Sequence, residues 1–204
     1  MTTPTPTRAR PVTRARLLAW LTIAWNAVEG VIAVAAGAAA GSLALVGFGL
    51  DSFVEVFAGG VVLWQLGGVA EERERRALRL IALSFFALAA YVVAEASRDL
   101  MVGNAAGESV VGVGLAAVSL AAMPALAWAK RRTGRALANP VVLADATETA
   151  LCSYLSAVLL VGLAVNATLG WWWADTLAAL VIAALAVREG REAWSGEACC
   201  EDGS

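Results

Sequence analysis

Histidine is absent from this chain of 204 residues. Its absence excludes Ser-His-Asp hydrolases, His-ligated metal sites and pH switches built on an imidazole. The three cysteines are too few for a disulfide framework, and two of them, Cys199 and Cys200, are adjacent. Only 16% of the residues are charged, whereas soluble domains average about 25%. This composition excludes intrinsic disorder and argues against an ordinary water-soluble fold.

The chain consists mainly of apolar sequence. Hydrophobic residues make up 60% of it, and the mean hydropathy is +0.72. Six apolar runs are each long enough to cross a bilayer as a helix of about 20 residues. They cover residues 17–40, 42–66, 78–97, 109–129, 140–168 and 171–187. Three tryptophans at 171–173 are typical of an interfacial aromatic belt. We therefore predict an all-α membrane protein, a bundle of six transmembrane helices over residues 16–192.

The basic residues fall on one side of this six-helix topology. They lie in the N-terminal tail, in predicted charged turns at 71–79 and 130–135, and after residue 187, and only Arg98 lies on the other side. That distribution places 14 of the 15 Lys and Arg residues on one side. The positive-inside rule makes this side cytoplasmic, together with both termini. We expect residues 1–15 to form a disordered basic tail facing anionic lipid, and residues 193–204 a short cytoplasmic tail.

Acidic residues lie deep within these runs, where a charge costs roughly 2.5–3.5 kcal/mol at the bilayer centre. They are Glu29, Asp51, Glu55, Asp145 and Glu148, with Glu95 and Asp175 nearer to the run ends. No Lys or Arg occupies the central part of any run, so we expect no internal cation to offset these acids. They must be protonated, solvated in a cavity, or bound to a cation supplied from outside. Each of these states indicates proton or cation handling.

Two pairs of residues have the spacing of ligands on one helix face. Asp51 and Glu55 are four residues apart near the middle of the run 42–66, and Glu148 and Cys152 repeat this spacing in the run 140–168. Two helices can therefore present two ligands each to a point between them. Three carboxylates and a thiolate suit a divalent transition metal, with Zn²⁺ as the default for tetrahedral O and S ligands. Metal entry would displace protons, which is a physical basis for proton-coupled transport.

The remaining acids have structural interpretations beside functional ones. Glu29 either hydrogen-bonds a neighbouring helix or supports the metal site. Asp145 lies one turn before the second ligand pair, where it either supports the ligands or relays protons. Glu95 is expected to pair with Arg98. Asp175 is expected to be interfacial or structural, and a role in supporting the site is the alternative.

Three segments of the chain resemble the motifs of a known family. Residues 42–55 are SLALVGFGLDSFVE, residues 143–152 are LADATETALC, and residues 173–180 are WADTLAAL. They are similar to the second-, fifth- and sixth-span motifs of cation diffusion facilitator transporters, and the resemblance covers nearly all of residues 16–192. It implies export of a divalent metal ion, usually Zn²⁺, from the cytoplasm in exchange for protons. By position, it implies the ligand set Asp51, Glu55, Glu148 and Cys152, with alternating access around a midplane site.

The chain departs from the family's pattern at three of these ligands. Glu55 and Cys152 stand where Asp is usual, and Glu148 stands where His or Asp is usual. A thiolate favours Zn²⁺ or Cd²⁺, whereas the acids alone would accept Mn²⁺ or Fe²⁺, so the ion is open among these and Co²⁺. We expect no permanent cofactor. Only about 15 residues follow the last run, too few for the family's cytoplasmic domain, so a homodimer would form through the membrane helices.

We therefore predict a divalent metal cation transporter, multi-pass in the cell membrane, with a bacterial inner membrane expected. Its expected partners are the lipid bilayer, the metal ion and protons, with no nucleic acid. One alternative is a metal-binding sensor or partner subunit that keeps the fold without transporting. Another is an intramembrane enzyme with Asp51 and Glu148 as a dyad. We predict that the protein is not an enzyme, because no sequence feature indicates a substrate gate.

Overall fold

The computed structural model describes residues 6–67, 71–102, 109–169, 171 and 173–195. Within these ranges the chain forms helices and no strands. The helices are α1 (Pro6–Ala40), α2 (Leu43–Gln65), α3 (Glu71–Val102), α4 (Val110–Leu137), α5 (Pro140–Leu169) and α6 (Trp173–Ser195). This arrangement confirms the predicted all-α bundle of six helices.

Several helices extend beyond their apolar runs. Of the predicted disordered tail, residues 1–15, residues 6–15 form the first turns of α1, and residues 1–5 lie outside the part of the chain that the structure describes. The predicted turn at 71–79 is the helical start of α3. The predicted basic loop at 130–135 belongs to the last turns of α4, which ends at Leu137 and is followed by Ala138 in the left-handed conformation. These three expectations were wrong for one physical reason. Arg, Lys and Glu end a membrane span, but they are good helix formers and do not end a helix.

Five of the helices are long and apolar enough to cross a membrane, namely α1 to α5. α6 is not among them, and it carries Asp175, Arg188 and Glu189 within its first eighteen residues. Large apolar side chains are exposed on the outer faces of the bundle, including Trp20, Val118, Tyr154, Val161 and Leu177. A water-soluble bundle would place polar residues there. The protein is therefore a multi-pass membrane protein.

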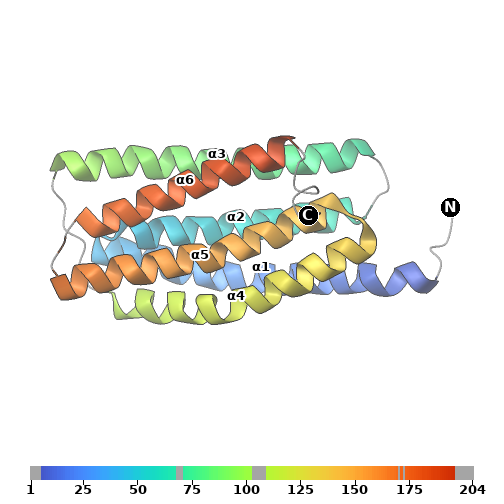
Figure 1. Ribbon diagram of the computed structural model, residues 1–204, viewed down its shortest axis with the longest axis horizontal. Coiled ribbons are helices and arrows are strands. Elements are labelled where there is room, and N and C mark those ends of the chain that lie inside the picture. The colour runs from blue at the N-terminus through green and yellow to red at the C-terminus, as the bar shows by residue number, and fades with distance from the viewer. Residues whose placement is uncertain (1–5, 68–70, 103–108, 170, 172, 196–204) are drawn as a thin grey trace, which may run out of the picture.

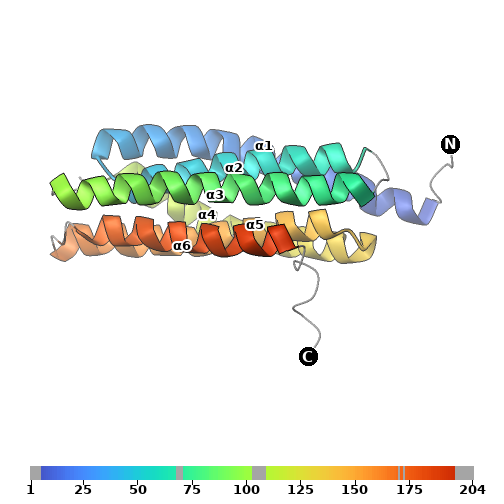
Figure 2. The same ribbon diagram turned by 90° about the horizontal axis from the view of Figure 1, so that it is seen from above.

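The helices lie in two layers. α1, α2 and α3 form one layer, and α4, α5 and α6 form the other, as two perpendicular views show (Figures 1 and 2). Across the layers α1 packs on α4, α2 on α5 and α3 on α6. Successive helices run in opposite directions, so the two layers have inverted topology (Figure 1). The middle helices, α2 and α5, meet at the centre of the bundle.

Most of the arginines lie together at one end of the bundle, which we call the arginine end. Because the helices alternate in direction, α1 starts and α4 ends at this side of the bundle, and α6 runs toward it (Figure 1). Three guanidinium groups there lie over tryptophan rings: Arg73 over Trp64 at 5.2 Å, Arg79 over Trp194 at 5.7 Å, and Arg132 over Trp128 at 5.5 Å. Arg and Trp both anchor helices at the bilayer interface. The arginine end is thus the surface predicted to be cytoplasmic.

Candidate metal centre

The four predicted ligands lie inside the bundle on its two middle helices. Asp51 and Glu55 belong to α2, Glu148 and Cys152 belong to α5, and none of them is more than 4% exposed. On α2 the two acids continue a buried stripe, spaced by three and four residues, that otherwise holds apolar and small side chains. This stripe faces the protein interior, so the same helical period that buries the core also buries the acids.

The carboxylates of Glu55 and Glu148 are buried without partners. None of their four oxygens has a hydrogen-bond partner of ordinary length and angle among the described residues, and Thr149 is the hydroxyl group that lies beside Glu55. Glu148 interacts electrostatically with Glu55 and Asp51, and so does the thiol of Cys152. The four groups therefore occupy one region between α2 and α5. A buried carboxylate that lacks a partner is costly, so this region favours the binding of a proton or a cation.

The four groups do not converge on one point in this structure. Among the side chains that the structure describes, no three of Asp, Glu, Cys or His lie close enough together to hold a metal ion. The four-ligand set stays a prediction. A bound ion would have to draw side chains of α2 and α5 toward one another.

A buried lysine lies beside these acids, so the expectation of no internal cation was wrong. Lys130 of α4 is 1% exposed, and its Nζ atom lies 2.9 Å from Oδ2 of Asp145. The same Nζ donates a hydrogen bond of 2.8 Å to Oγ1 of Thr149. Asp145, for which we predicted a supporting or relay role, is thus the ion-pair partner of an ammonium group.

Two signals in the sequence point to Lys130. It is the only lysine among the 15 basic residues. It also continues the buried stripe of α4 through Ser119, Met123 and Ala127, at intervals of three and four residues. The cluster of basic residues at 130–135 led to the prediction of a basic loop. In the structure Arg131, next to the buried Lys130, is exposed. Adjacent helical residues point about 100° apart, so a lysine can face the core while its neighbour faces outward.

A hydrogen bond at the arginine end shows which residues of α5 and α2 lie at the same position along the helix axes. Nδ2 of Asn139, the residue before α5, donates to Oε1 of Gln65, the last residue of α2, at 2.9 Å. At 1.5 Å per residue, Asp145 lies about 9 Å along α5 from this level, and Glu148 and Glu55 lie about 14 and 15 Å from it. The ion pair of Asp145 therefore lies between the arginine end and the unpartnered acids.

The structure favours the hydrogen-bonding interpretation of Glu29. Its buried carboxylate accepts hydrogen bonds from Oγ of Ser52 at 3.1 Å and from Oγ of Ser119. Glu29 thereby links α1 to α2 and α4, and it has the partners that Glu55 and Glu148 lack.

The two acids near the run ends lie apart from this cluster. The predicted pair of Glu95 and Arg98 is confirmed, with 2.8 Å between Oε2 and Nη1. Asp175 belongs to the first turn of α6, and its side chain lies outside the part of the chain that the structure describes.

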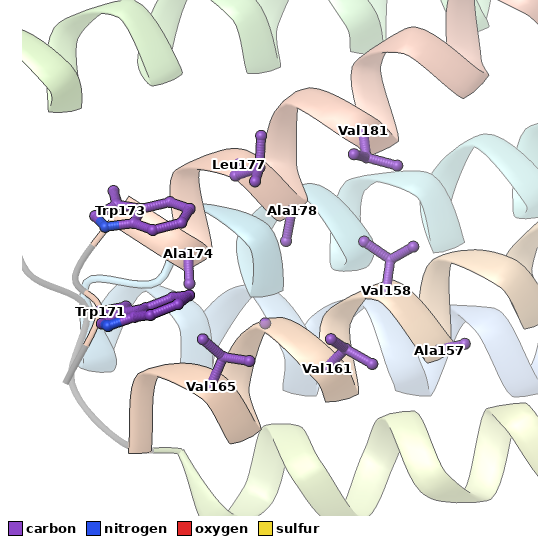
Figure 3. Close-up of a pocket in the computed structure, with 11 residues that line it drawn as sticks. Ala157, Val158, Val161, Val165, Trp171, Trp173, Ala174, Leu177, Ala178 and Val181 are labelled. Carbon is purple, nitrogen blue, oxygen red and sulfur yellow. The ribbon is translucent and has the colours of Figure 1, made fainter. Parts of the chain in front are cut away.

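A pocket of about 420 Å³ lies between α5 and α6, and its lining is apolar (Figure 3). Val161 of α5 and Leu177 of α6 contribute to it, together with Trp171 and Trp173. The two indole rings are stacked, with centroids 5.1 Å apart and planes at 20°. None of the side chains that the structure describes around this pocket is acidic, so those side chains offer no ligand to a cation. The candidate site is the acidic region between α2 and α5.

Comparison with known proteins shows the family. Residues 79–195 match the cation efflux transmembrane domain, which is more than half of the chain and extends from α3 to α6. The matched segment includes Glu148 and Cys152 but not Asp51 or Glu55. No curated protein matches the chain. The chain belongs to the cation efflux family, whose members are membrane transporters of metal cations.

Proposed function

We propose that this protein exports a divalent metal ion, with Zn²⁺ favoured, from the cytoplasm in exchange for protons. The observation that carries the proposal is the pair of unpartnered carboxylates, Glu55 on α2 and Glu148 on α5, buried where the two layers meet. Each carboxylate must hold a proton or a cation to be stable there. Because a metal ion binds the deprotonated groups, its entry releases protons, and the two occupancies exclude each other.

The two-layer architecture supports the same site. Many secondary transporters consist of two repeats of inverted topology, with the substrate bound near the bilayer midplane between them. Here the predicted ligands lie on the middle helix of each layer. Rocking of one layer against the other would open the site first to one side of the membrane and then to the other. The arginine end would face the cytoplasm of a bacterium, and a homodimer would form through the membrane helices.

The experiment that tests this function is metal flux in sealed proteoliposomes with a trapped Zn²⁺ indicator. We expect Zn²⁺ to move when a pH gradient is imposed and to stop when an ionophore collapses that gradient. The variant Glu95→Gln, in the exposed pair with Arg98, should transport like the wild type. Flux that is the same with and without the gradient would refute proton coupling. A folded protein that moves none of Zn²⁺, Cd²⁺, Mn²⁺, Fe²⁺ or Co²⁺ would support the sensor or partner-subunit alternative.

The thiol of Cys152 is proposed to set the choice of ion. Cys152→Ser replaces a soft ligand by a hard one of similar size, so the ratio of Cd²⁺ flux to Mn²⁺ flux should fall by about tenfold or more. Both fluxes are measured in the same vesicles. The control is the double variant Cys199→Ser/Cys200→Ser, which changes the other two thiols of the chain. An unchanged ratio in Cys152→Ser would exclude the thiol as a ligand.

A further inference from the structure

We infer that the ammonium group of Lys130 is a tethered cation, which lies on the arginine-end side of the acidic cluster and lowers its affinity for the metal ion. The inference rests on the proposed function, because it assumes that the metal binds among these acids. It makes Lys130 a positioning residue that tunes binding and release without touching the ion.

The position of the ammonium group is set by two contacts on α5. Nζ of Lys130 pairs with Asp145 at 2.9 Å and donates to Thr149 at 2.8 Å. Thr149 Oγ1 in turn donates to the backbone carbonyl oxygen of Asp145 at 3.1 Å. These contacts use two of the three N–H donors of the ammonium group. They hold a unit positive charge at a defined place inside the bundle.

This charge acts on the candidate ligands. Lys130 interacts electrostatically with Glu55, Glu148 and Cys152, which belong to both ligand pairs. Asp145 is neutralised by its own contact with the ammonium, so the remaining acids carry the negative charge that attracts the substrate. Without the ammonium, Asp145 would add another uncompensated negative charge and a dication would bind more tightly, and the effect is large because little water screens it.

The ion pair also lies on the side from which the ion would enter. It is about 9 Å from the level of Asn139, whereas Glu148 and Glu55 are about 14 and 15 Å from it. An ion that arrives from the arginine end therefore comes near Lys130 before it reaches the unpartnered acids. A transporter must release its ion as well as bind it, and a fixed positive charge prevents a cluster of several acids from trapping a dication.

The presence of lysine, and not arginine, at position 130 agrees with the interpretation of its side chain as a tethered cation. The other 14 basic residues are arginines, and those whose side chains the structure describes are exposed or half-buried. The only lysine is the one buried base in the described part of the chain. An ammonium group is a compact point charge, whereas a guanidinium is a broad planar fork with five donors. The group that contacts Asp145 and Thr149 is thus the more compact of the two cations.

The test is Zn²⁺ binding to the full chain in detergent, measured by titration calorimetry in a Cys199→Ser/Cys200→Ser background. Lys130→Gln removes the charge and keeps N–H donors for Asp145 and Thr149. It should raise the Zn²⁺ affinity by about tenfold or more. In proteoliposomes the same variant should lower both KM and kcat for Zn²⁺, because release becomes slower. Asp145→Asn should act in the opposite direction, since the freed ammonium can then pair with Glu55 or Glu148.

The signs of these effects separate the inference from a purely structural role. If Lys130 only held α4 to α5, both single variants would bind Zn²⁺ more weakly. We expect opposite signs, an affinity near the wild type in Lys130→Gln/Asp145→Asn, and no change in Arg131→Gln, which removes a charge from the exposed neighbouring residue.

Lys130→Arg, which keeps the charge, should bind within about threefold of the wild type, since only a change of charge is worth tenfold or more. The comparison of Lys130→Gln with Lys130→Arg shows whether the charge at position 130 lowers the Zn²⁺ affinity, even if Asp145→Asn does not fold. Unchanged or weaker binding in folded Lys130→Gln would overturn the inference. Zn²⁺ binding that persists in Asp51→Asn would instead refute the proposed site.

Discussion

Asp51→Asn is expected to reduce proton-driven Zn²⁺ flux by about 100-fold or more. The amide has nearly the volume of the carboxylate, so packing inside α2 is preserved. It carries no negative charge and cannot exchange a proton for a metal ion. The substitution therefore removes both a ligand and an exchangeable proton from the acidic region, and losses of this kind are large for metal ligands and their supports. The measurement is the initial rate of Zn²⁺ movement in proteoliposomes under a fixed pH gradient.

The control for this prediction is Glu95→Gln, which also changes an acid to its amide but at an exposed ion pair. It should transport at the wild-type rate. Thermal unfolding of both variants in detergent shows whether each is folded, so that a loss of flux is not a loss of structure. An Asp51→Asn protein that keeps more than half of the wild-type flux would remove Asp51 from the site.

Asp145→Ala is expected to be the most destabilising substitution among the buried acids, at about 3–5 kcal/mol. It leaves the ammonium group of Lys130, 1% exposed, without its carboxylate partner. Attraction to Glu55 would offset only part of this cost. The free energy of unfolding in detergent measures the effect. Lys130→Met combined with Asp145→Leu should recover most of the stability, because a buried ion pair replaced by apolar groups of similar size is often neutral.

The exposed ion pair of Glu95 and Arg98 shows how much stability is lost when an ion pair in water is broken. Its N–O distance is 2.8 Å, against 2.9 Å for Lys130 and Asp145, so the two pairs differ mainly in burial. Glu95→Ala should cost only about 0–1 kcal/mol, because water solvates each charge when the other is removed. Equal losses in Asp145→Ala and Glu95→Ala would show that the buried ammonium group finds another partner or loses its charge.

The number and type of elements were predictable from the sequence. A segment in lipid must satisfy its own backbone hydrogen bonds, so the length and polarity of each apolar run are enough to predict a helix. The helix ends were not predictable in this way, as residues 71–79 and 130–135 show. Their charges mark where the lipid ends, and the helices continue beyond it.

The pairing of Asp51 with Glu55 was determined by the sequence itself, because residues four apart lie on one face of any α-helix. The same holds for Glu148 and Cys152. Contacts between helices were decided only by the tertiary structure. Glu29 accepts a hydrogen bond from Ser119, 90 residues away, and this contact depends on how α1 and α4 are rotated about their axes.

Lys130 shows most clearly the difference between what the sequence determines and what the tertiary structure decides. The two residues that follow it are arginines at the end of an apolar run, and they indicated a solvated loop. Its burial depends on the rotation of α4, and its pairing depends on α5 presenting Asp145 at the same height. The sequence by itself determined which groups the membrane helices carry. The packing of α2, α4 and α5 decided which of them are neutralised from within and which are left for a cation, because the charge balance of a buried group depends on neighbours from other helices.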